Sequence, residues 1–193
     1  LVSSEGRQYP VQVQHGSAAA PGQPLEPLLE QLILQALATD SGSLLVFLPG
    51  AAEIRRLQAR LQEALQDRPE VDIAPLYGDL DFAAQRQAIR PAEPGRRKIV
   101  LATPIAETSL TIEGVRVVID SGLCREPAFD PVSGMTRLHT RRISRAAAEQ
   151  RAGRAGRTEP GVCYRLWSVD QHAQLAAQSP AEILQADLAP LAL

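Results

Sequence analysis

Short apolar runs of strand length alternate along this chain with longer segments in which apolar residues recur at helical spacing. From Ile54 to Leu65 an apolar residue returns every three or four positions, among arginines and glutamates. Strands that read as continuous apolar runs are covered on both faces, and strand-helix alternation gives parallel strands with right-handed crossovers. The sequence therefore predicts an α/β fold, a parallel sheet with helices on both faces, built on apolar runs at 44–48, 71–76, 98–102 and 115–119.

Further elements extend this alternation toward both ends of the chain. Ser144 suits a helix N-cap, and the helix that it begins is expected to end near Gly153 and Gly156. A turn signal at 130–134 lies between extended-looking residues, which predicts a projecting β-hairpin within 122–139. The remaining expected elements are a strand at 8–13, a flexible linker at 16–24, helices at 25–37 and 82–89, a strand at 162–166, and short helical pieces at 169–193, one of them beginning at Pro180.

Length and composition limit the kind of protein this can be. The 193 residues fit one α/β domain with an appendage, which we place at 1–168 and 169–193. No apolar run approaches the roughly 20 residues needed to span a bilayer, and no secretory signal is visible. We therefore expect a cytoplasmic protein with no membrane partner. Cys124 and Cys163 show neither metal-ligand nor redox spacing, so we expect buried thiols and no metal site.

Positive charge is concentrated in one window of the sequence. Between Arg137 and Arg157 there are seven arginines and one acid, so this window carries +6 while the rest of the chain carries −8. Such a concentration indicates phosphate-bearing partners, and the alternative is a solvated basic face. Ile143 and the alanines at 146–148 favour a helix that is partly packed.

The most specific signal within this window is Gln-Arg-Ala-Gly-Arg-Ala-Gly-Arg at 150–157. Its arginines are three residues apart around one helix end, so their guanidinium groups can converge on a single polyphosphate. Phosphoryl transfer depends mainly on charge stabilisation, which a planar and permanently charged guanidinium supplies well. The segment therefore has the composition of an arginine finger, and the alternatives are a disordered Gly/Arg tail or an ordinary basic helix.

The segment at 150–157 resembles motif VI of superfamily 2 helicases, and Leu-Ala-Thr-Pro-Ile-Ala-Glu-Thr-Ser-Leu-Thr-Ile-Glu-Gly at 101–114 resembles motif V of their DEAH-box branch. Leu-Leu-Val-Phe-Leu-Pro-Gly-Ala-Ala-Glu-Ile at 44–54 is similar to motif IV. The resemblance spans most of 7–168 and implies the second RecA-like domain of a DEAH-box helicase. Details at 129–134, 142–144 and 163–167 are most similar to the bacterial HrpB type, and 180–188 is similar to the start of its winged-helix domain.

The resemblance also implies roles for individual residues. In the nucleotide site, Gln150 would contact the γ-phosphate or the attacking water, Arg154 and Arg157 would be the fingers, Arg151 would support or bridge, and Glu113 would lie near the ribose. On the nucleic-acid side, Thr103, Thr108 and Thr111 would approach the backbone, and Ser109 would couple nucleotide state to strand grip. Gly50 and Gly78 would permit close approach of the strand, and the hairpin would act as the strand separator.

Two positions depart from the family pattern. Pro104 stands where an asparagine is usual, which removes a backbone donor and holds Thr103 extended. At the end of the helix at 82–89, relatives often carry an aromatic residue that stacks on adenine, and here Arg90 would have to stack instead.

Half of an ATP site is absent from this sequence. The sole lysine, Lys98, lies in no Walker A pattern, and no Asp-Glu-Ala-His segment occurs. The resemblance implies that ATP binds with Mg²⁺ whose ligands belong to a first RecA-like domain of the same chain, and that the other partner is single-stranded nucleic acid, with RNA favoured. The alternative is a non-catalytic nucleic-acid-binding module that uses only the basic face.

Overall fold

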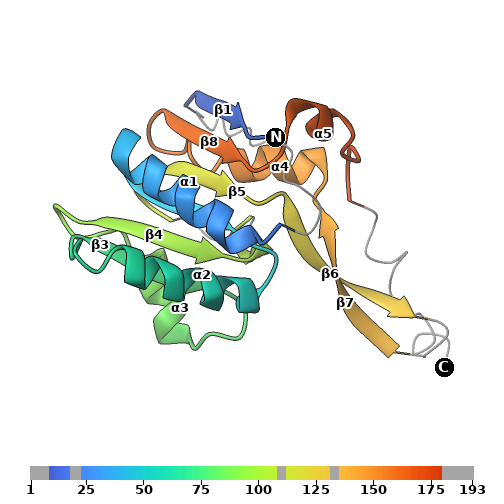
Figure 1. Cartoon of the computed structure of the whole chain (residues 1–193), viewed down its shortest axis with the longest axis horizontal. Coiled ribbons are helices and arrows are strands. Elements are labelled where there is room, and N and C mark those ends of the chain that lie inside the picture. Colours follow the sequence, from blue (N-terminus) through green and yellow to red (C-terminus); the bar gives the residue numbers. More distant parts are fainter. Residues whose placement is uncertain (1–8, 18–22, 108–111, 131–134, 180–193) are drawn as a thin grey trace, which may run out of the picture.

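The computed structural model describes residues 9–17, 23–107, 112–130 and 135–179, with the side chains of 128–130 left aside. Figure 1 shows a twisted sheet with helices on both faces and a hairpin that projects from it. All strand pairs of the sheet are parallel, as the sequence predicted. In spatial order the strands are β1 (Val11–His15), β8 (Gly161–Arg165), β5 (Val115–Asp120), β2 (Ser43–Phe47), β4 (Arg97–Ala102) and β3 (Val71–Leu76).

Successive residues of the central strand β2 point into two separate cores. Leu44 and Val46 belong to the core under the helices α1 (Leu25–Thr39) and α2 (Ala51–Ala64). Leu45 and Phe47 belong to the opposite core, which contains Ala88 and Ala152 of the helices α3 (Phe82–Ile89) and α4 (Arg145–Ala152). This alternation is the consequence of strand geometry and confirms the expected coverage of both faces.

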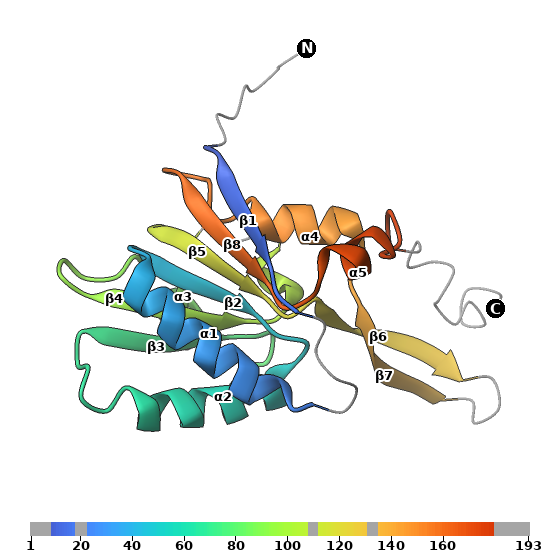
Figure 2. The same ribbon diagram turned by 45° about the horizontal axis from the view of Figure 1, so that its top comes forward.

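The expected hairpin is formed by β6 (Leu123–Asp130) and β7 (Met135–Arg142), which pair antiparallel. All eight residues of β7 are exposed, and Figures 1 and 2 show the pair extending away from the sheet. The second strand continues to Arg142, beyond the limit of 139 that the sequence suggested. The turn at 131–134 lies outside the described residues.

The ends of the chain show smaller differences. The described part of the first strand begins at Val11 and ends at His15, two residues beyond the expected limit of 13. Of the helical pieces expected after 169, one is described, α5 (Val169–Ala173), which begins with a capping box between Ser168 and Gln171. The piece expected at Pro180 lies outside the described residues.

Both cysteines are free and buried, as expected. Burial raises the pKa of the Cys124 thiol to about 11 and that of Cys163 to about 12, so neither is a reactive thiolate at neutral pH. Within the described residues, no helix combines the length and the apolar character required to cross a bilayer.

Candidate nucleotide and nucleic-acid interface

The helix α4 carries the arginine-rich segment and is fixed at both ends by local capping. Ser144 accepts a hydrogen bond from the Ala147 amide at 3.2 Å, which makes it the predicted N-cap. Gly153 is the C-cap, and its amide donates back to the Glu149 carbonyl at 2.9 Å. The predicted helix bounds are therefore confirmed, and the arginines that follow are held on the turn that leaves the helix.

The three candidate catalytic residues have different environments. Gln150 is exposed near the end of α4, Arg157 is partly exposed, and only 6% of Arg154 is accessible. Burial, and then the neighbouring charge of Arg157, lower the pKa of Arg154. The charge of Glu107 acts in the opposite direction on Arg154, so this guanidinium is influenced by a carboxylate of the motif V segment as well as by Arg157.

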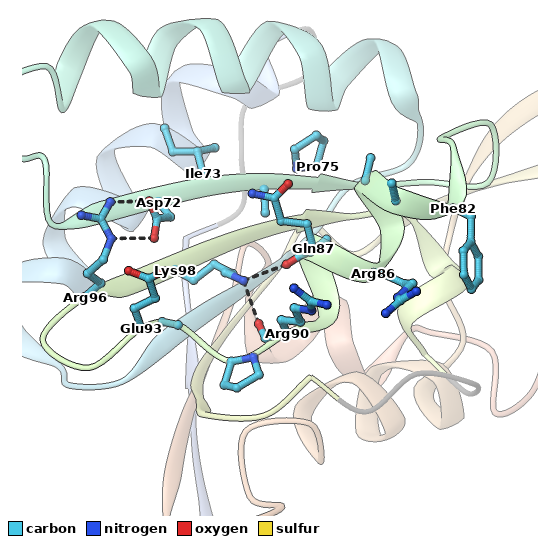
Figure 3. Close-up of a pocket in the computed structure, with 16 residues that line it drawn as sticks. Asp72, Ile73, Pro75, Phe82, Arg86, Gln87, Arg90, Glu93, Arg96 and Lys98 are labelled. Atoms are coloured by element: carbon cyan, nitrogen blue, oxygen red, sulfur yellow. Dashed lines mark hydrogen bonds and ion pairs between the residues drawn. The ribbon is translucent and has the colours of Figure 1, made fainter.

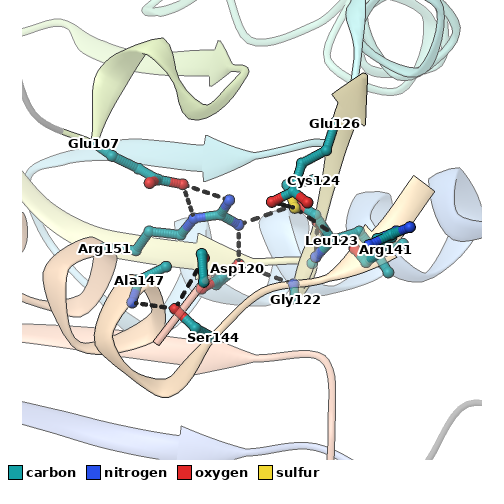
Figure 4. A network of polar contacts seen from close by, with 12 residues as sticks. Glu107, Asp120, Gly122, Leu123, Cys124, Glu126, Arg141, Ser144, Ala147 and Arg151 are labelled. Carbon is teal, nitrogen blue, oxygen red and sulfur yellow. Dashed lines mark hydrogen bonds and ion pairs between the residues drawn. The ribbon is translucent and has the colours of Figure 1, made fainter. Parts of the chain in front are cut away.

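Arg151 is the most enclosed charged residue of this segment, with no exposed side-chain area. Its Nε donates to Glu107 Oε1 at 2.7 Å and its Nη1 to Asp120 Oδ1 at 2.8 Å, as Figure 4 shows. The guanidinium also lies over the Phe47 ring, 4.8 Å from the centroid. Burial alone would lower the pKa of Arg151, but the charges of Asp120 and Glu107 outweigh it, and the pKa is raised.

These contacts connect three segments that are far apart in sequence. Glu107 follows the 3-10 turn η1 (Pro104–Ala106) after β4, and Asp120 ends β5. Arg151 therefore ties the α4 helix to the motif V segment, which agrees with the supporting role that the resemblance implies. Direct contact between Arg151 and a nucleotide stays a prediction, because in this structure the guanidinium faces carboxylates of its own chain.

The candidate strand-binding residues that are described lie at one edge of the sheet. Phe47 of β2 and Leu76 of β3 both align with Ala102 of β4, so the loops that contain Gly50, Gly78 and Thr103 leave the same edge. This is the edge formed by the carboxyl ends of the strands, where ligands of open α/β sheets usually bind. Thr108, Ser109 and Thr111 lie outside the described residues.

The two glycines at this edge differ in how much space they leave. A Cβ at Gly78 would meet nothing within 4 Å, so its surface is open. A Cβ at Gly50 would lie 2.5 Å from Arg125 Nη1, because the Arg125 side chain reaches from β6 to Glu53. The flexible end of the Arg125 side chain therefore lies beside Gly50, whereas the surface at Gly78 is open, and contact of either glycine with a strand stays a prediction.

Pro104 is the first residue of the η1 turn, a position where a missing amide costs no hydrogen bond within the turn. Thr103 before it is extended, with ψ of 177°, as predicted from the proline. Further along, Glu113 is exposed beside Gly114, whose φ is 76°. The position of Glu113 leaves its carboxylate accessible to a ligand.

Arg90 lies at the opposite edge, beside a hollow of about 860 Å³ between α3 and β3 (Figure 3). It is the C-cap residue of α3, and the Lys98 ammonium donates to its carbonyl at 2.7 Å and to that of Gln87 at 2.9 Å. Burial lowers the pKa of Lys98. The sole lysine of the chain therefore holds the helix end that presents Arg90.

Sequence reasoning missed Glu107, Asp120 and Lys98, which position the candidate residues without being members of the predicted set. Asp120 had a detectable signal, because a carboxylate at the end of a buried apolar strand requires a partner. Its partner could not be identified from spacing alone, since Arg151 lies 31 positions away.

Comparisons with known proteins agree with this geometry. Residues 25–159 match the model of the helicase conserved C-terminal domain. The ATP-dependent RNA helicase HrpB of Escherichia coli (strain K12) is 48% identical over 191 residues, which are 99% of this chain and 23% of that protein. The pre-mRNA-splicing factor ATP-dependent RNA helicase prp22 of Schizosaccharomyces pombe is 40% identical over 93% of this chain and 16% of its own length.

Solved structures give the same result. The crystal structure of the E. coli DExH-box NTPase HrpB superimposes on 97% of this chain with a TM-score of 0.89 and 48% identity, and this chain covers 23% of that one. The chain belongs to the helicase conserved C-terminal domain family. Within that family it is similar to the domains of DEAH-box ATP-dependent RNA helicases, HrpB among them, and it spans about a quarter of the HrpB length.

Proposed function

We propose that this chain is the second motor domain of an ATP-dependent RNA helicase, with the RecA-like domain at 1–168 and the start of a winged-helix domain at 169–193. A first RecA-like domain of the same protein would supply the phosphate-binding loop and the Mg²⁺ ligands. The single observation that carries the proposal is the buried Arg151 bridge. It holds the arginine-bearing helix end and the motif V segment as one unit.

The arginines would act when ATP draws the two domains together. Arg154 and Arg157 would then meet the phosphates bound by the first domain and stabilise the charge that develops in the transition state. Gln150 would orient the attacking water, Arg90 would stack on the base, and Glu113 would lie near the ribose. Two arginines on the turn that follows α4 fit a polyphosphate ligand, because guanidinium groups can bind phosphate with paired hydrogen bonds.

The strand would bind at the edge that bears Gly78 and Thr103. Motif V also contains Thr108, Ser109 and Thr111, and hydroxyl and amide groups of such a loop can hold phosphates without reading sequence. The exposed hairpin would separate strands. Because Arg151 joins motif V to motif VI, a change at the nucleotide would reach the strand grip through a short and rigid path.

The proposal predicts that the chain by itself does not hydrolyse ATP above background. The phosphate-binding loop and the magnesium carboxylate would come from the other domain, and the arginine groups alone cannot hold the nucleotide. The measurement is phosphate release by the highly purified chain with ATP and Mg²⁺, compared with the full-length protein. Turnover that scales with the amount of the chain and disappears in Arg157→Ala would refute the prediction.

A second prediction concerns Pro104, which offers no amide to a phosphate. Pro104→Asn in the full-length protein should tighten single-strand binding by roughly 0.5 to 1.5 kcal/mol, about one net hydrogen bond. The measurement is a titration of single-stranded RNA at fixed salt, since salt alone changes such affinities strongly. Pro104→Ala restores the same backbone amide without the asparagine side chain, so it shows which of the two matters. Unchanged or weaker binding in both variants would reject the idea.

The competing function is a nucleic-acid-binding module without catalysis. The hairpin favours it, because the exposed strand β7 carries Arg137, Arg141 and Arg142. The two functions differ in what the full-length protein does with ATP. Strand-stimulated hydrolysis and unwinding on matched RNA and DNA would support the motor, and binding without hydrolysis would support the module.

A further inference from the structure

The segment after β8 packs against the first half of α4. We call residues 168–179, which contain α5, the connector. Figures 1 and 2 both show α5 beside α4, although β8 and a turn separate the two helices in sequence. The proposed function places this segment at the start of a winged-helix domain and gives it no part in the nucleotide site.

The connector satisfies the first amides of α4. The first N–H groups of a helix have no partner within the helix. Here the Arg145 amide donates to the Ala176 carbonyl at 2.8 Å, and the Ala146 amide donates to the Ala177 carbonyl at 3.2 Å. The third amide, that of Ala147, is taken by Ser144. Two of the first three helical amides of α4 thus depend on the connector.

Side chains fix the same contact from a second direction. Leu175 of the connector is buried in one cluster with Trp167, Ile143 and Ala148, the last of which belongs to α4.

Glu149 of α4 lies next to the connector, but the ion pair that it makes is with Arg165 of β8, and burial lowers the pKa of His172 in α5. Glu149 Oε1 accepts a hydrogen bond from Arg165 Nη2 at 2.8 Å and lies 3.8 Å from His172 Nε2 in α5. Glu149 immediately precedes Gln150 in the sequence, so β8 restrains α4 next to the candidate catalytic residues, and the connector holds the helix through its first amides and Leu175.

We propose that the connector is a positioning element for the arginine fingers. The α4 helix has only eight residues, and a helix of that length is not stable by itself, so its orientation depends on what holds it. A displacement of about 1 Å in a catalytic group can lower a rate by about 100-fold. The connector touches no nucleotide group, and it acts through α4 on Arg154 and Arg157. This inference rests on the proposed function of those arginines.

A matched pair of variants at Arg145 isolates the connector hydrogen bond. Arg145→Pro removes the amide N–H that donates a hydrogen bond to the Ala176 carbonyl. Proline is well tolerated at the first helical position when the preceding residue is extended, and Ser144 is extended, with ψ of 164°. Arg145→Ala removes the same exposed charge and keeps the amide. The difference between the two variants therefore reports the connector contact and not the arginine side chain.

In the full-length protein, kcat for ATP hydrolysis should be about 3- to 10-fold lower in Arg145→Pro than in Arg145→Ala, with less than about 2-fold change in KM for ATP. If the substitution only impaired folding, it would reduce the fraction of active protein, and kcat can be corrected for that fraction by active-site titration. Equal corrected kcat values in the two variants would overturn the proposal.

Two further measurements cover the case in which Arg145→Pro does not fold. Leu175→Ala loosens the connector and leaves every residue of α4 in place, and it should lower kcat in the same way; an unchanged kcat contradicts the proposal. In the wild-type protein, the Arg145 and Ala146 amides should be protected from hydrogen exchange, and free exchange at either would also contradict it. Arg154→Lys separates the two claims, because normal turnover in that variant would reject the finger assignment itself.

Discussion

Replacing Arg154 or Arg157 with lysine in the full-length protein is expected to lower kcat for ATP hydrolysis by about 10³-fold. Lysine keeps the positive charge but lacks the planar, forked geometry of a guanidinium, so stabilisation of the transition state is lost more than ground-state binding. The dissociation constant of a non-hydrolysable ATP analogue should therefore change much less than turnover. Steady-state kinetics with that binding measurement make the comparison.

Arginines on the hairpin provide the control for this result. Arg137 and Arg141 lie in the same basic window but on the exposed strand β7. Changing either to alanine should leave unstimulated hydrolysis nearly intact, and at most reduce RNA affinity and its salt dependence. If the lysine variants keep near-normal kcat while losing strand affinity, the basic cluster is a nucleic-acid patch. That outcome would favour the nucleic-acid-binding module over the motor domain.

The largest expected effect on stability is that of Arg151→Met, which should lower the free energy of unfolding by about 3 to 5 kcal/mol. Methionine fills similar space but leaves the Asp120 carboxylate buried without its ionic partner, and Asp120 has no exposed side-chain area. Glu107 also loses its partner, but it is more exposed, so it contributes less. Urea unfolding of the chain, followed by circular dichroism, measures the change.

The source of that instability is tested by adding a second substitution. Asp120→Asn removes the buried negative charge and keeps a similar shape, so the double variant should recover part of the loss. Arg125→Met is a control of the same chemistry at a partly exposed pair, and it should cost less than about 1 kcal/mol. A loss in Arg151→Met no larger than that in Arg125→Met would show that the buried bridge does not hold the domain together.

Much of the fold could be predicted from local patterns alone. The strand at 71–76 and the helix at 82–89 have the bounds that the apolar periodicity predicted, and the parallel order followed from alternation of strands and helices. Apolar spacing is sufficient here because each element buries one stripe or one strand in a common core. Ser144 was predicted as a cap for a similar reason, since its side chain acts within its own turn.

Contacts between distant segments were decided only by the tertiary structure. The motif resemblance suggested that Arg151 supports the site, but Glu107 and Asp120 became its partners because β4 and β5, on either side of β2, end at the same edge of the sheet. The sequence indicated Gly156 as a residue near the end of a helix, but a Cβ there would lie 2.5 Å from the Tyr9 carbonyl oxygen, so this glycine makes room for the chain entering β1.

The connector is the clearest case of such a tertiary contact. The carbonyl groups of Ala176 and Ala177 carry no side-chain signal, and a backbone acceptor is the same in every residue. The sequence by itself determined which segments form strands and helices and which residue types could meet a phosphate. The tertiary structure decided which charges are buried together and which amides hold the α4 helix, because those contacts depend on where the crossovers place the ends of distant elements.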